Sequence, residues 1–228
     1  YDSNVNRLHV WDGTTVRRVG LITATAPTVA TLGGAGITAT RFFRQRNAIQ
    51  VAGITTERSE PSTSVSLALV DDSGWRVTKG AVSGDGETHW EVEAAAAAIG
   101  PWYRIATVAV GTTTYDDTSA TIPTTFLSDV EGLYVPPPSV KYIISDGAVL
   151  LMAGAWETSG TAGQTTPKQN RGWFTRPRGA SDGSDDESIP QTSIQNNWID
   201  DLDAGPITGL AGPVYGEIEA LGALFVVS

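Results

Sequence analysis

The stretch that decides the fold class is 37-ITATRFFRQRNAIQVAGI-54, which is rich in residues that favour β-strands. Within it, Thr38–Arg44 and Ala48–Ile54 are each expected to form a strand. Three further segments of the same character follow, separated by residues that favour turns. These segments are Val65–Val70, His89–Glu93 and Trp102–Val110. Short strands at this spacing predict an antiparallel β-sandwich.

Five consecutive alanines, Ala94–Ala98, interrupt this pattern. Alanine favours helix, but Gly100-Pro101 follows at once, and so short a helix is marginal in water. We therefore expect either an extension of the strand that carries Trp90 or a single turn.

Two Asp-Gly pairs predict hairpins on either side of this region. Asp12-Gly13 lies within Arg7–Val19, and Asp146-Gly147 lies within Lys141–Ala153. Asp-Gly tolerates the positive φ that both positions of a two-residue hairpin turn require. The likeness of the two hairpins indicates one sheet architecture that the sandwich interrupts.

Composition excludes several classes of protein. The 228 residues contain no Cys, which excludes disulfides, thiolate metal sites and cysteine nucleophiles. The net charge of −10, from 25 acidic and 15 basic residues, argues against a whole-surface attraction to nucleic acid or anionic membranes. No apolar run approaches the roughly 20 residues that span a bilayer, so we expect a soluble chain.

Linkers and loops divide the chain. Thr25–Thr28 and the proline-rich Val135–Ser139 are expected to be linkers, the second of them stiff. Two segments are expected to be long exposed loops, 157–170, which is rich in Gly, Thr, Ser and Gln, and 180–191, which is rich in Ser, Asp and Gly. The expected divisions are therefore 1–26, 27–135 and 136–228.

Five motifs, in their order along the chain, carry a family resemblance. They are Trp11–Thr14, Gly111–Thr118, Pro136–Pro138 with Lys141-Tyr142, Gly172–Pro177 and Gly205–Leu210. This order resembles the hub or nozzle proteins of short bacteriophage tails, in which a β-propeller carries an inserted fibronectin-like domain.

The resemblance implies an all-β fold of partial β-propeller-like sheets with an inserted immunoglobulin- or fibronectin-like sandwich. Residues 1–26 would contribute a hairpin to the propeller-like domain, 27–135 the insertion, and 136–228 the rest. A complete propeller needs about four blades or more, whereas this chain supplies about two, so we expect an incomplete one.

The resemblance also implies a function. The chain would be a structural protein of the virion tail that forms a homo-oligomeric ring around the DNA exit channel, a hexamer being one candidate. Other tail or head–tail connector proteins would be its partners, and DNA only a passing cargo, which an acidic wall would keep from sticking. Neither catalysis, a cofactor nor membrane insertion is expected.

One segment is a candidate subunit interface, because Arg and Trp are enriched at protein–protein contacts. The alternative is an exposed strand edge that arginines keep soluble. The candidate residues are Arg171, Trp173, Phe174, Arg176 and Arg178.

Catalytic and metal-binding motifs are weak. His9 and His89 lie on expected strands without a G-x-S-x-G motif, and are interpreted as ordinary sheet residues. Gly33–Gly36 lacks the Lys-Ser/Thr of a phosphate-binding loop and is interpreted as a loop. The acidic cluster within 182–187 is the best metal candidate, but a solvated loop is the favoured interpretation, so no metal site is expected.

The alternative function is a carbohydrate-binding or adhesin module, because exposed aromatic rings can stack on sugars. The chain has seven Trp. Most lie in strand-like runs, where a large apolar side chain is expected to anchor the core. These are Trp75, Trp90, Trp102, Trp173 and Trp198. An adhesin would therefore need an exposed Trp outside the core.

Overall fold

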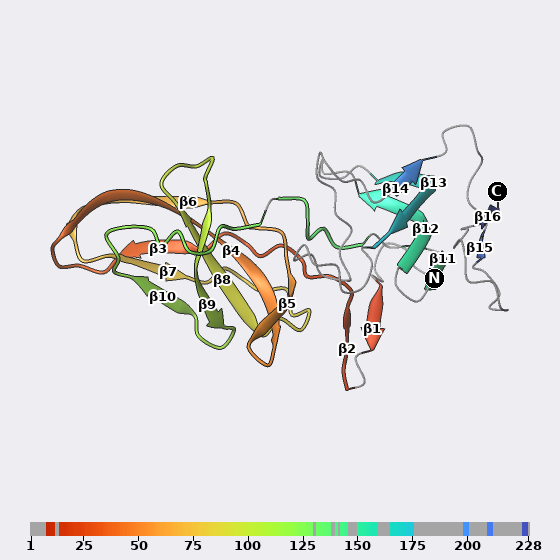
Figure 1. Cartoon of the computed structure of the whole chain (residues 1–228), viewed down its shortest axis with the longest axis horizontal. Coiled ribbons are helices and arrows are strands. Elements are labelled where there is room, and N and C mark those ends of the chain that lie inside the picture. Colours follow the sequence, from red (N-terminus) through yellow and green to blue (C-terminus); the bar gives the residue numbers. More distant parts are fainter. Residues whose placement is uncertain are drawn as a thin grey trace. The chain divides into compact units, whose positions relative to one another are not determined.

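The computed structural model of the chain is all-β, as the sequence predicts (Figure 1). It describes residues 8–11, 14–129, 131–137, 140, 142–145, 150–158, 165–175, 198–200, 209–211 and 225–227. These residues form sixteen strands and no helix. Accordingly, the described part of the chain contains no helix that could cross a membrane.

The chain divides into two compact units. Unit 1 combines Tyr1–Gly20 with Leu133–Ser228, and unit 2 is the intervening Leu21–Gly132. The divisions expected from the sequence fall after residues 26 and 135, and the observed ones after residues 20 and 132. Unit 2 is therefore inserted in the sequence of unit 1.

Unit 2 contains two antiparallel sheets (Figure 1). The first has the order β10-β7-β3, formed by Thr114–Asp117, Trp75–Thr78 and Thr28–Thr31. The second has the order β5-β4-β8-β9, formed by Ile54–Arg58, Ile37–Val51, His89–Ala95 and Tyr103–Ala109. In addition, β6 (Val65–Asp72) pairs with the first half of β4.

One apolar core joins the two sheets of unit 2. Trp75 enters it from the first sheet, and Phe43 and Trp90 enter it from the second; all three are fully buried. Each indole N–H donates to a backbone carbonyl, Trp75 Nε1 to Leu67 at 3.0 Å and Trp90 Nε1 to Thr112 at 2.9 Å. Because buried indoles need such acceptors, both tryptophans are fixed as core anchors. This confirms the prediction for Trp75 and Trp90.

The two segments predicted as separate strands within 37–54 are parts of one long strand, β4. It ends at Val51, which pairs with Ile54 of β5. Ala52 and Gly53 form the turn between them, with φ of 51° and 80°. The predicted strand across Ala48–Ile54 is therefore wrong in its last residues, because Ala gives no turn signal although its backbone here is left-handed.

The alanine run is part strand and part turn, as expected. Ala94 and Ala95 are the last residues of β8, and both are fully buried. Residues 96–99 then turn, and Gly100 N–H donates to the carbonyl of Ala97 at 3.0 Å. Because the alanine side chain is small, the end of β8 can lie close against the core.

Both ends of unit 2 lie against one short segment. Leu21 forms a parallel bridge with Ser59. At the other end, the backbone N–H of Gly132 donates to Oε2 of Glu60 at 2.8 Å. The chain therefore enters and leaves unit 2 at neighbouring points.

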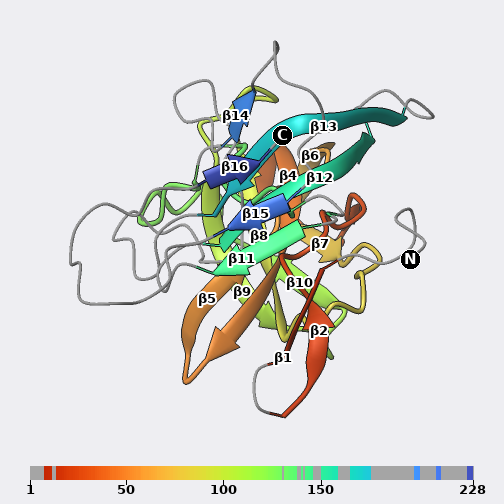
Figure 2. The ribbon, with the colours of Figure 1, turned by 90° about the vertical axis from the view of Figure 1, so that its right-hand side faces the viewer.

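The described residues of unit 1 form three small antiparallel sheets. β1 (His9–Trp11) pairs with β2 (Val16–Arg18), and β15 (Gly209–Ala211) pairs with β16 (Phe225–Val227). The largest sheet has the order β11-β12-β13-β14, formed by Tyr142–Ser145, Leu150–Thr158, Thr165–Phe174 and Trp198–Asp200 (Figure 2). A core cluster of Met152 and Trp173, with half-buried Leu8 and Val140 against it, links the hairpin to this sheet.

The two predicted hairpins are present. Trp11 pairs with Val16, and Ser145 pairs with Leu150. Both Asp-Gly pairs lie outside the described residues, so the two-residue turns stay a prediction.

The loop predicted over 157–170 is wrong at both ends. β12 and β13 extend into it and pair there, with Glu157 opposite Thr166 and Thr158 opposite Thr165. Three of these four residues are threonines, whose β-branched side chains favour strands although they are polar. Residues 159–164 lie outside the described part of the chain.

The turn at Ala52 gives a stability prediction. Ala52→Asn should stabilise the full chain by about 0.5–1 kcal/mol, because Asn tolerates the left-handed backbone better than Ala does. Ala52→Val should destabilise it, because a β-branched side chain is strained at this φ. Denaturation midpoints of the three proteins test this, and equal midpoints would contradict it.

Candidate functional site

The outer face of the second sheet of unit 2 carries buried charges. Side chains alternate between the two faces of a strand, so the neighbours of core residues on β4 and β8 point away from the core. Arg44 lies opposite Glu93 in the β4–β8 register, and Arg46 lies opposite Glu91. All four side chains are buried. The two strands thus match arginines to glutamates on one face.

Glu93 binds the two arginines of β4. Its Oε2 accepts a hydrogen bond from Arg44 Nε at 2.5 Å, and its Oε1 accepts one from Arg46 Nε at 2.7 Å. Arg46 also donates from Nη1 to the carbonyl of Ser59 at 2.9 Å. Burying charges is tolerated only with such partners, so these groups depend on one another.

Glu91 binds two arginines, one from each end of the strand order β5-β4-β8-β9. Arg58 of β5 donates from Nε to Oε2 at 2.9 Å, and Arg104 of β9 donates from Nη1 to Oε1 at 2.9 Å. The Glu91 side chain is 1% exposed, whereas those of Arg58 and Arg104 are 16% and 24% exposed. A buried carboxylate therefore holds two guanidinium groups that reach the surface.

The segment that leaves unit 2 covers part of this face; we call residues 126–129 and 131–132 the exit strap. Its backbone pairs with the edge at the start of β9, where Leu127 bridges Tyr103. The carbonyl of Asp129 accepts from Arg46 Nη2 at 2.9 Å, and Glu131 Oε1 accepts from Arg44 Nη1 at 2.5 Å. The strap is thus fixed by the charges beneath it.

A groove of about 520 Å³ opens on this face between β5 and β9. Its lining combines exposed apolar, hydroxyl, amide and guanidinium groups. The lining residues are Gln50, Gly53, Ile54, Thr55, Arg58, Arg104, Ile105, Ala106, Thr107 and Phe126. The guanidinium carbon of Arg104 lies 4.9 Å from the centre of the Phe126 ring, a cation–π contact.

A separate buried pair lies at the other end of unit 2. Arg41 of β4 donates to Asp117 of β10, and both side chains are 3% exposed. The Arg41 guanidinium carbon also lies 4.2 Å from the centre of the Trp75 ring. The pair joins the two sheets next to the core, and its enclosure indicates a structural role.

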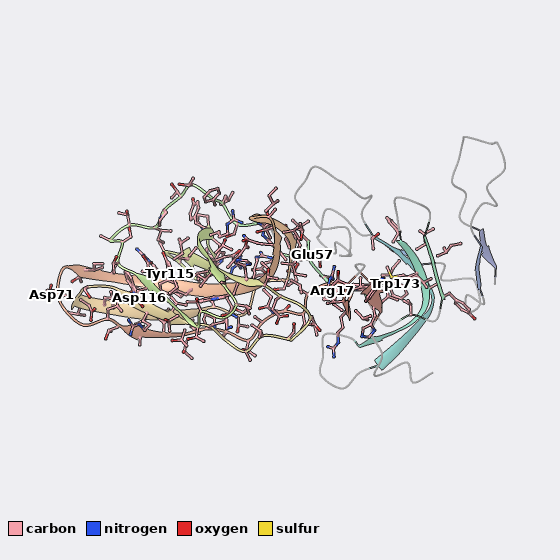
Figure 3. All side chains as sticks on the ribbon, turned by 90° about the horizontal axis from the view of Figure 1, so that it is seen from below. Arg17, Glu57, Asp71, Tyr115, Asp116 and Trp173 are labelled. Carbon is pink, nitrogen blue, oxygen red and sulfur yellow. The ribbon has the colours of Figure 1, made fainter. Side chains whose placement is uncertain are left out.

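Arg76 of β7 forms two hydrogen bonds with Asp116 of β10, the residue before Asp117. Figure 3 labels Asp116 and the adjacent Tyr115. Arg76 Nε and Nη2 donate to the two carboxylate oxygens at 2.7 and 2.6 Å. These bonds hold the pKa of the Asp116 carboxyl below its usual value. The pKa of Tyr115 is raised, chiefly by burial.

The predicted interface segment falls partly within the described residues. Trp173 is 1% exposed in the core of unit 1, and Phe174 is half-buried. Arg171 lies on β13, opposite Asp200 of β14. Arg176 and Arg178 lie outside the described residues. The predicted role of this segment in subunit contact stays a prediction, although Trp173 serves the core.

The other candidates of the sequence analysis are two histidines, an acidic cluster and an exposed tryptophan. His9 and His89 are on β1 and β8, as expected. The acidic cluster 182–187 lies outside the described residues, and the described ones contain no group of three or more potential metal ligands. Trp11 is 61% exposed.

The groove residues were missed by the sequence analysis. Arg58 and Arg104 occur singly in unremarkable strands, and Phe126 lies in a segment without strand periodicity. The sequence did contain one signal of the charged face. Arg44 and Arg46 are two residues apart on one strand, and Glu91 and Glu93 have the same spacing on another. Such matched patterns favour direct cross-strand pairing.

Comparison of the chain with protein-family models, with curated proteins and with solved structures gave no match. Chemically, the outer face offers paired guanidinium groups held in place by buried carboxylates. Such groups bind and orient anions.

Breaking the charge network should destabilise unit 2. Glu93→Gln removes the carboxylate that buried Arg46 and Arg44 share and leaves Arg44 with Glu131 alone, so we expect a loss of about 3–5 kcal/mol. Hydrogen exchange of the β4 and β8 amides in the full chain measures this loss. The control is Glu131→Gln, because Glu131 is 69% exposed and its loss should cost under about 1 kcal/mol. Equal effects of the two variants would contradict the prediction.

The Arg76–Asp116 pair gives a pH prediction. In the wild type the lowered pKa of Asp116 adds stability above the ordinary carboxyl pKa of about 3.9, and this stability disappears as pH falls through the lowered value. Arg76→Gln should return the pKa towards the ordinary value, as a carboxyl NMR titration would show. An unchanged titration of Asp116 would refute the assignment.

Proposed function

We propose that this chain is a structural component of a bacteriophage tail, of the hub or nozzle type. It assembles into a ring around the DNA exit channel and docks neighbouring tail proteins, and it acts without catalysis. In this proposal, its place is the virion tail.

The observation that carries the proposal is the insertion of one β unit into the sequence of another. Unit 2 interrupts unit 1 between Gly20 and Leu133, which is the arrangement that the motif order implies for this family. Both units are built from antiparallel strands. Because a fold alone does not define a function, the proposal also rests on the five motifs themselves.

The finer fold belongs to the same proposal. Unit 1 would be part of a β-propeller, which the four-stranded sheet β11-β12-β13-β14 supports, since a propeller blade is a four-stranded sheet whose strands follow in sequence. Unit 2 would be the immunoglobulin- or fibronectin-like insertion, which its two antiparallel sheets around one core support.

Ring assembly requires surfaces for neighbours, and the described sheets offer open edges. β3 and β10 are the two edge strands of the first sheet of unit 2. In the second sheet, β9 pairs with β8 on one side, and on its other side only the exit strap pairs with it among the described residues. An open edge can accept a strand from another chain. We further propose that Arg171, Phe174, Arg176 and Arg178 contact a neighbouring subunit, with Trp173 supporting them from the core.

Electron microscopy of the native source particles, labelled with an antibody against the full chain, tests the proposal. We expect the label at the tail tip and a symmetric ring in the reconstruction. As a second readout, Arg176→Glu combined with Arg178→Glu should reduce assembly of the chain while leaving the hydrogen exchange of unit 2 unchanged. A chain absent from the particles, or a monomer in all preparations, would refute the proposal.

A further inference from the structure

We propose that the groove between β5 and β9 of unit 2 binds a saccharide that carries a carboxylate. This inference goes beyond the proposed role in the tail and does not depend on it. It rests on the charge of the groove, on the fixed position of its arginines and on the chemistry of its walls.

The charged side chains that line the groove are both arginines. Arg58 and Arg104 line it, and no Asp or Glu is among the described residues that do so. The carboxylate that holds both arginines, Glu91, is 1% exposed and lies beneath them. The chain as a whole carries a net charge of −10. A ligand in the groove therefore meets guanidinium groups rather than the carboxylate beneath them, which favours an anion.

The arginines are held in position before any ligand arrives. Glu91 binds one nitrogen of each guanidinium at 2.9 Å, and Asp129 Oδ2 lies 3.4 Å from Arg58 Nη1. Arg104 is also stacked against Phe126. Because these contacts restrict both side chains, a ligand loses little binding energy in ordering them. Planar guanidinium groups suit the two oxygens of a carboxylate.

The remaining walls favour a sugar over an acidic peptide. Gln50, Thr55 and Thr107 supply neutral hydrogen-bonding groups within the same groove, which match the hydroxyl groups of a sugar ring. The Phe126 side chain is 55% exposed, and an exposed aromatic ring can pack on the apolar face of a sugar. A volume of about 520 Å³ lies in the range of small-molecule sites.

Calorimetric titration of the full chain with matched sugars tests the proposal. The probes are trigalacturonate with neutral galactotriose, and sialyllactose with neutral lactose. We expect saturable binding of at least one acidic sugar and none of its neutral counterpart. The absence of saturable binding of both acidic sugars at millimolar concentration would overturn the proposal, as would equal binding of the neutral sugars.

Variants locate the binding in the groove. Arg104→Lys keeps the positive charge beside Glu91 but removes the planar fork, and should weaken binding on the order of tenfold. Phe126→Ala should weaken it roughly threefold to tenfold. The matched controls are Arg76→Lys and Ile99→Ala, which change an arginine and an exposed apolar residue outside the groove; Ile99 is 96% exposed.

Three results of these experiments would overturn the proposal. One is binding that the groove variants and the control variants weaken equally. Another is saturable binding of a poly-glutamate peptide that Arg104→Lys weakens, without binding of either acidic sugar, because the groove would then be a site for acidic protein segments. The third is binding weakened by Trp11→Ala but not by Phe126→Ala, which would place the sugar on the hairpin of unit 1.

Discussion

The structure of unit 2 depends on two glutamates of one strand that bind four arginines. Glu91 and Glu93 hold Arg44, Arg46, Arg58 and Arg104, which come from the other three strands of the sheet β5-β4-β8-β9. A shift of β4 against β8 by one residue would turn these charges into the apolar core. The cost of burying an unpaired ion therefore fixes the register of the sheet, whereas apolar packing alone would tolerate more variation.

This constraint reaches beyond the sheet itself. The same arginines bind the exit strap through Asp129 and Glu131, so the direction in which the chain leaves unit 2 is set by electrostatics. The groove depends on it as well, because its two arginines keep their positions only while Glu91 lies beneath them. Stability, the exit of the chain and the candidate binding site thus share one set of ion pairs.

The sequence predicted the kind of structure better than its details. Strand-rich segments and Asp-Gly pairs were sufficient for an all-β fold and for two hairpins, since these signals are local. The turn at Ala52 was missed because its left-handed backbone is imposed by the pairing of β4 with β5. The groove was missed because Arg58, Arg104 and Phe126 meet only through long-range pairing, which a single sequence does not encode locally. The finer fold and the interface at Arg171–Arg178 remain predictions.

The contacts of Leu21 with Ser59 and of Gly132 with Glu60 bring the two ends of unit 2 together. For unit 1, the 112 residues of unit 2 therefore act as a short loop. The entropic cost of closing that loop depends on the distance between its ends, which the folded unit 2 fixes, and not on the number of residues inserted. Such a module can be gained, lost or exchanged in evolution without rebuilding the sheets that receive it.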